Sequence, residues 1–314
     1  MIQPHDNTNN QPQGNNDRPR NDHLDQQQQQ QQQAFLPMNP AAACFWSLLR
    51  VPVPPLLDPK RMQLTEQERE WALAIREHIQ SSAELDNVSD LTCAQLAIVV
   101  QHDVDEAIRR VWVMQELKGD LKIQDSLEEA RRSFTKMLEY WPGAILSVYF
   151  SAEDETFVVV FDNPKFRGYK THEKMRTTLL IVHYLCRMLN PDIEATRKGV
   201  IFFAECEGYC LHSDMMDVKL WRHVFGDFYG SYPMNFQQIK MFHTPSGINL
   251  LVALARKALP THITSKIAVG CQFEGGRLDK FYLTPTPEIA AMKTFNKMIE
   301  FLQLRYTNEK EFKL

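Results

Sequence analysis

Long apolar runs and an excess of either charge are both missing from this 314-residue sequence. Since no stretch of about 18 continuous apolar residues occurs, no transmembrane helix is predicted. Lysine and arginine number 35 and aspartate and glutamate 39, and this balance argues against a nucleic-acid-binding surface. The N-terminal residues lack a basic-then-apolar signal peptide, and aspartates interrupt any basic presequence. We therefore expect a soluble cytoplasmic protein, at most peripheral on membranes.

Paired cysteines and the usual nucleotide-binding and hydrolase motifs are also missing. The six cysteines are scattered without CxxC pairs, which is typical of reduced, packed thiols and gives no zinc spacing. The sequence has no glycine-rich dinucleotide fingerprint, no Walker lysine loop and no GxSxG nucleophile motif. We expect no cofactor, no metal and no enzymatic activity.

Composition divides the chain into four parts. Residues 1–33 are rich in Gln, Asn, Asp and Pro, end in a polyglutamine run, and are predicted to be disordered. Residues 34–63 are apolar but interrupted by prolines, which favours an extended strap on the domain surface. The alternative for the strap is a partner-binding or membrane-touching patch around Phe45 and Trp46. A helical lobe over 64–143 and an α/β domain over 144–314 follow.

Helix-capping signals define the helical lobe. Thr65 and Glu68 form a capping box before the first amphipathic helix. A second helix covers LTCAQLAIVV. A third begins at Asp103, and Gly119 suits the position that ends it. Ser126 and Glu129 form a second capping box, before a fourth helix.

After residue 143 the pattern changes to short β-branched and aromatic runs that alternate with helices. Such runs predict buried strands, and their alternation with helices is typical of a mostly parallel sheet with crossover helices. A last amphipathic helix begins at Pro287. The four predicted strands are TFVVVFD (156–162), VIFFAE (200–205), QQIKMFHTP (237–245) and SKIAVG (265–270).

Residues 245–260, PSGINLLVALARKALP, form an apolar segment bounded by prolines. Its centre, INLLVALA, has one polar side chain, so it is too apolar for an ordinary surface helix and too short to cross a membrane. One interpretation is a plain crossover helix, buried between the sheet and the C-terminal helix.

Several motifs in order support a different interpretation. They are VIFFAECEG (200–208), Tyr232-Pro233, IKMFHTP (239–245), LLVALARKALP (250–260) and SKIAVG, with HDVDEAIRRV (102–111) upstream. With these motifs the chain resembles the CRAL-TRIO lipid-binding family over roughly residues 90–270. The resemblance implies an α/β fold with an N-terminal helical lobe and a mostly parallel sheet whose crossover helices enclose a hydrophobic pocket. In that family the apolar helix is a mobile gate over the pocket.

The resemblance implies a protein that binds a lipid or other hydrophobic small molecule and transfers or presents it at membranes. Burial of each methylene of such a ligand gains about 0.8 kcal/mol. Lys266 stands where phosphoinositide-binding members use a basic residue for the headgroup phosphate. Arg256 and Lys257 would meet an anionic membrane surface, or alternatively form an ordinary solvated helix end. The remaining expected ligand contacts are Val158, Val160, Phe202, Ala204, Trp221, Phe225, Met241, His243, Leu250, Leu251 and Leu254.

The sequence departs from the family pattern at basic positions. Gln101 and His102 replace part of the usual Leu-Arg-Ala-Arg, and Tyr-Pro-Met-Asn replaces Tyr-Pro-Glu-Arg. Two headgroup contacts are thereby missing, so the cargo is open between a phospholipid, an isoprenoid and another apolar molecule. A protein-interaction module on the same fold without cargo is the alternative function. An α/β enzyme using Glu205 and His212 is a more distant third.

Overall fold

Parallel strands joined by helices form the centre of the fold in the computed structural model. All described residues belong to one unit of the chain, residues 38–314. The predictions for the glutamine-rich tail and for Phe45 and Trp46 lie outside the described residues. The structure describes residues 58–85, 88–140, 146–151, 156–162, 172–206, 226–227, 229–244, 246–249, 252–253, 256, 261–271 and 288–314.

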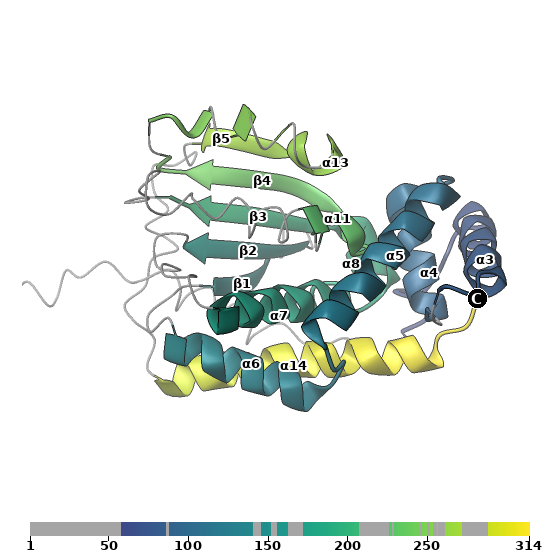
Figure 1. Ribbon diagram of the computed structural model, residues 1–314, viewed down its shortest axis with the longest axis horizontal. Coiled ribbons are helices and arrows are strands. Elements are labelled where there is room, and N and C mark those ends of the chain that lie inside the picture. Colours follow the sequence, from purple (N-terminus) through teal and green to yellow (C-terminus); the bar gives the residue numbers. More distant parts are fainter. Residues whose placement is uncertain are drawn as a thin grey trace, which may run out of the picture. The chain divides into compact units, whose positions relative to one another are not determined.

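The sheet has five strands in sequential order (Figure 1). Strands β2 to β5 are parallel, whereas β1 pairs antiparallel with β2. The four predicted strands are therefore present and parallel, which confirms a mixed α/β fold; β1 was not predicted. The strands are β1 (Leu146–Ser151), β2 (Thr156–Asp162), β3 (Val200–Glu205), β4 (Phe236–Phe242) and β5 (Ile267–Cys271).

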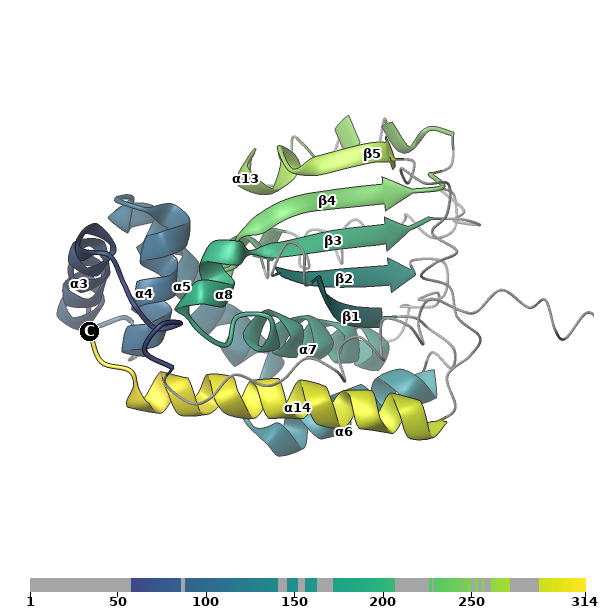
Figure 2. The same ribbon diagram turned by 180° about the vertical axis from the view of Figure 1, so that it is seen from behind.

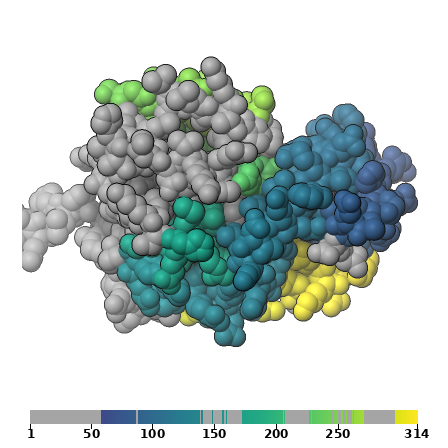
Figure 3. Space-filling model, in the orientation of Figure 1, coloured from purple at the N-terminus to yellow at the C-terminus, as the bar shows by residue number. Residues whose placement is uncertain are grey.

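Four helices precede the sheet: α3 (Glu66–Ser81), α4 (Asp90–Val100), α5 (Val104–Leu121) and α6 (Leu127–Tyr140). Thr65 and Glu68 make both hydrogen bonds of the predicted capping box, at 3.2 and 2.8 Å. The centre of α4 is buried, in keeping with its nearly uniform apolar sequence. Helix α5 lies at the surface of the molecule (Figure 3).

One predicted helix boundary and one predicted capping box differ in detail from the structure. Helix α5 continues past Gly119 to Leu121 because Lys122 adopts the left-handed conformation instead, with its N–H bonded to the carbonyl of Gly119. Before α6, Ser126 accepts the N–H of Glu129 at 3.1 Å, but the Glu129 carboxylate accepts from Gln124 N–H and Tyr184 O–H. The second capping box is therefore only half formed.

Five helices of the described part of the chain follow β2, and the last of them, α14, is a long C-terminal helix. Helix α14 packs against α4, α6 and α7, and Figures 1 and 2 show it running beneath α7. These helices are α7 (His172–Met188), α8 (Ile193–Lys198), α11 (Tyr229–Ser231), α13 (Thr261–Thr264) and α14 (Glu288–Glu311). Of the described helices, none is both long enough and apolar enough to span a membrane.

One hydrophobic core joins the N-terminal helices to the sheet. Ile75 of α3, Leu96 of α4 and Val159 of β2 belong to the same buried cluster. Phe157 of β2 meets Phe301 of α14 edge to face, with ring centroids 5.4 Å apart. The helical lobe and the sheet are consequently stabilised together.

Gly199 connects α8 to β3 in a backbone conformation that other residues rarely adopt, with φ of +70°. A methyl group at this position would lie 2.5 Å from the carbonyl oxygen of Asn235, the atom that accepts the Val200 N–H. We expect Gly199→Ala to lower the free energy of unfolding by at least about 2 kcal/mol, measured by urea denaturation.

Gly119 is the matched control because it lies within α5 with open space around its Cα. Gly119→Ala should raise the free energy of unfolding by about 0.5–1 kcal/mol. Equal effects of the two substitutions would contradict the assigned role of Gly199.

Candidate functional site

Part of the predicted apolar segment lies against part of the predicted pocket wall. Ile248 and Val252 are buried in a small cluster with Met241 of β4 and Cys206 after β3. Ala204 of β3 packs against the same cluster, as do Ile267 and Val269 of β5. The parallel register sets Ala204 beside Met241, and Met241 beside Val269. Residues from three strands thus form one apolar surface beneath the segment. We call the four buried residues and their three neighbours the satellite cluster.

Phe202 lies on the same face of β3 as Ala204 but belongs to the main core. Its ring contacts Tyr229 and Phe236 at centroid distances of 5.2 and 5.5 Å, and those two rings are themselves 5.2 Å apart. This aromatic group contributes to the main core and not to the satellite cluster.

Val158 and Val160 do not share a wall with Phe202 and Ala204. The register pairs the two valines with Ile201 and Phe203. Because alternate residues of a strand belong to opposite faces, these positions lie on the other side of the sheet. The continuous apolar run of β2 shows no alternation, and the register places these two predicted contacts and the pair Phe202 and Ala204 on opposite faces of the sheet.

Three predicted polar contacts lie at the surface. His243 follows β4, is exposed and has φ of +45°. Lys266 is exposed at the amino end of β5, where its carbonyl accepts the Ile239 N–H. Arg256 is also exposed. The structure therefore does not bring these side chains into one site. The other predicted residues lie outside the described part of the chain: Trp221, Phe225, Leu250, Leu251, Leu254, Lys257 and His212.

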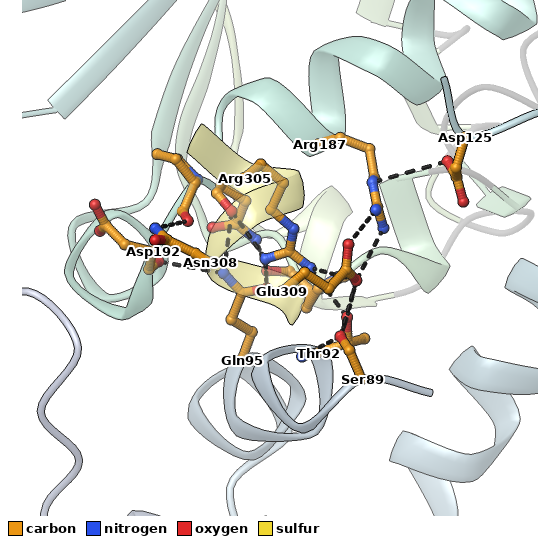
Figure 4. Close-up of polar contacts among 12 residues, drawn as sticks. Ser89, Thr92, Gln95, Asp125, Arg187, Asp192, Arg305, Asn308 and Glu309 are labelled. Carbon is orange, nitrogen blue, oxygen red and sulfur yellow. Dashed lines mark hydrogen bonds and ion pairs between the residues drawn. The ribbon is translucent and has the colours of Figure 1, made fainter. Parts of the chain in front are cut away.

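A buried polar cluster that the sequence did not suggest lies between α4, α7 and α14 (Figure 4). Arg305 of α14 is only 3% exposed, Arg187 of α7 is 9% exposed, and both pair with Glu309. Arg305 donates to Thr92 Oγ1 and to the Asn190 carbonyl, each at 3.0 Å, and also to the Gln95 side chain. We define the buried polar cluster as Thr92, Gln95, Arg187, Asn190, Arg305 and Glu309.

The charges in this cluster depend on one another. Burial disfavours ionisation of Glu309, but Arg305 and Arg187 outweigh that effect and lower its pKa to about 2. Hydrogen bonds from Ser89 at 2.8 Å and Thr92 at 3.1 Å act in the same direction. Burial lowers the pKa of Arg305 to about 10, so this side chain remains a cation at neutral pH. Glu309 is thus an anion that pairs with two buried cations.

A hydrogen-bonded chain begins beside the buried polar cluster at Asp125, whose carboxylate lies 3.9 Å from Arg187 Nε, and leads towards the turn before β4. His183 Nε2 lies 2.7 Å from Asp125 Oδ1, and its Nδ1 contacts the Tyr232 hydroxyl. Burial lowers the pKa of His183, while Asp125 opposes that shift. A neutral imidazole that donates to the Asp125 carboxylate must accept from Tyr232. The chain therefore joins the loop after α5, α7 and the turn after α11.

A cavity of about 150 Å³ lies beside the buried polar cluster. Helices α4, α5, α7 and α14 line it, together with Tyr232 and Pro233. None of the predicted ligand contacts that the structure describes lines it, but Tyr232 and Pro233 of the Tyr-Pro motif do. The lining comprises Val88, Ser89, Thr92, Gln95, Val111, Met114, Gln115, Lys118, Cys186, Arg187, Asn190, Tyr232, Pro233, Arg305 and Glu309.

Glu309→Gln should lower the free energy of unfolding by about 3–5 kcal/mol at pH 7, because two buried arginines lose their counter-charge. The folded pKa of Glu309 is depressed, so its contribution is present above the unfolded value near 4.5 and is lost as the pH falls towards about 2. Urea denaturation at pH 7 and pH 3 should show a smaller difference from wild type at pH 3.

Glu300 supplies the control, since it lies on the same helix, is exposed and pairs with Lys297 at 3.0 Å. Glu300→Gln should change the free energy of unfolding by less than about 1 kcal/mol at either pH. A Glu309→Gln effect that is equal at pH 7 and pH 3 would contradict the assigned ionisation.

Comparison of the sequence with protein-family models and with curated protein sequences gives no match. Function is therefore inferred from the residues and their geometry.

Proposed function

We propose that this protein binds a lipid or another hydrophobic small molecule between its sheet and the apolar segment, and transfers or presents it at membranes. The observation that carries the proposal is the satellite cluster, in which Ile248 and Val252 cover Ala204 and Met241. The order of the sequence motifs, which resembles that of the CRAL-TRIO family, also supports it. In that order the apolar segment stands where the family has its mobile gate helix.

The satellite cluster is small, so separating its described side chains from the sheet costs little free energy. Two described side chains of the segment, Ile248 and Val252, are buried there. Exposing them costs about 1.5–3 kcal/mol each, or about 3–6 kcal/mol together. A hydrocarbon ligand recovers about 0.8 kcal/mol per methylene, so roughly four to eight buried methylenes offset the opening. An ordinary acyl chain supplies that many.

The strand residues beneath the segment suit a hydrocarbon ligand. Ala204, Met241, Ile267 and Val269 present only apolar side chains, and Ala204 is the smallest of them. The exposed Arg256 lies on the segment itself, where a cation gains about 1 kcal/mol near an anionic membrane surface. Opening at such a surface would transfer the ligand without exposing it to water.

Ala204→Trp should remove ligand binding because the indole occupies the space between β3 and the apolar segment. Protein incubated with mixed phospholipid vesicles and re-isolated would be measured by native mass spectrometry before and after solvent extraction. We expect the wild type to carry one lipid per chain, and Ala204→Trp to carry at most about a tenth as much.

Ala268→Trp is the matched control. Ala268 is exposed on β5 and pairs in register with Lys240, on the other side of the sheet from Met241. This variant should bind lipid like the wild type. Bare wild-type protein after incubation would contradict the proposal and favour the protein-interaction module without cargo. An equal loss of bound lipid in both tryptophan variants would show that the satellite cluster is not the lipid-binding site.

A further inference from the structure

We propose that the cavity beside the buried polar cluster binds a small phosphate- or carboxylate-bearing ligand. The proposal is independent of the hydrophobic site, since none of the residues of the satellite cluster lines this cavity. Its lining comes from helices of both halves of the chain, so a ligand here would contact α4, α5, α7 and α14 at once.

The charge of the lining favours an anion. Among the lining residues that the structure describes, three are cations, Lys118, Arg187 and Arg305, and one is a carboxylate, Glu309. Asp125 lies next to them and pairs with Lys118 at 2.7 Å. Counting Asp125 as well still leaves one cation in excess. Two of these cations, Arg187 and Arg305, are buried and share the carboxylate of Glu309. A buried cation is costly unless it is well paired, so an anion in the cavity would add to this pairing.

Two arginine N–H groups without an acceptor in the described part of the chain also favour an anionic ligand. The Nε atoms of Arg187 and Arg305 are buried and have no hydrogen-bond acceptor among the described residues. The Asp125 carboxylate lies 3.9 Å from the Arg187 Nε, which is too long for a hydrogen bond. Guanidinium groups bind phosphate and carboxylate oxygens preferentially, because their planar N–H groups match the oxygen geometry.

The volume limits the size of the ligand. A cavity of about 150 Å³ holds a molecule of benzene size, which is large enough for a phosphate ion or a short organic acid. A nucleotide or an acyl chain would not fit. Val88, Val111 and Met114 line part of the wall, so a short hydrocarbon portion is also accommodated.

Lys118→Gln tests the site at a side chain that is one-third exposed, where folding is expected to survive. The matched control is Lys136→Gln, because Lys136 also pairs with a carboxylate, Glu173, at 2.9 Å, but lies away from the cavity on α6. Inorganic phosphate and succinate would be titrated calorimetrically into the full chain, against potassium chloride of equal ionic strength.

We expect saturable one-to-one binding of phosphate or succinate to the wild type and to Lys136→Gln, and at least about tenfold weaker binding to Lys118→Gln. Gln115→Glu, which adds a negative charge to the lining, should weaken binding in the same direction. Lack of saturable binding to the wild type, or equal affinity of the wild type, Lys118→Gln and Gln115→Glu, would overturn the proposal.

Phosphatidylcholine vesicles that contain phosphatidic acid distinguish a free anion from a lipid headgroup. A lipid headgroup is the ligand if vesicle binding falls in Lys118→Gln and free phosphate competes for it. A free anion is the ligand if only phosphate binding depends on Lys118; both results support the site. Ala204→Trp should leave phosphate affinity unchanged, so failure of the hydrophobic site and failure of this site are separable.

Discussion

The pairing of Glu309 with Arg187 and Arg305 is the constraint on which the arrangement of the helices depends. A buried arginine is tolerated when its charge is paired and most of its N–H groups find acceptors. Arg305 meets this requirement only if α14 holds one rotation and one axial position against α4 and α7. Helix α14 then brings Phe301 onto the sheet. Thus one ion-pair network sets the position of the C-terminal helix and, through it, of the main core.

The two ends of the sheet differ in the apolar clusters to which their side chains belong. At the amino end of β3, Gly199 contacts Asn235, and the aromatic group around Phe202 joins the main core. Beyond Phe202, Ala204 belongs to the satellite cluster, in which four of the described side chains are buried. Among the described residues the larger apolar cluster lies near the helices, and we propose that the apolar segment separates without disturbing the ion-pair network. Such a division is what a carrier of hydrophobic cargo requires, with a stable frame and a cover of low local stability.

Local patterns predicted the strands and several helix starts, but not the polar contacts between distant parts of the chain. The β-branched runs at 156–162 and 200–205 are strong local signals, and both are strands. Strand β1, LSVYFS, was missed because two serines weaken its apolar pattern. The face of the sheet to which Val158 and Val160 belong was not predicted, because a strand that is apolar throughout shows no alternation. Thr92 and Glu309 are hydrogen-bonded across 217 positions, a contact that no local period reports. The sequence signal for this cluster was the spacing of Arg305 and Glu309, which places a cation and an anion four residues apart in the last helix.

Hydrogen–deuterium exchange of the full chain, followed by mass spectrometry, tests the central claim most directly. Peptides covering residues 246–253 should exchange through a local opening of about 3–6 kcal/mol, well before peptides from α7 and α14, and lipid vesicles should change their exchange selectively. Peptides from α4, α7 and α14 should exchange together, since the buried polar cluster joins these helices. Protection of residues 246–253 equal to that of α7, unchanged by vesicles, would contradict a separable cover over the sheet.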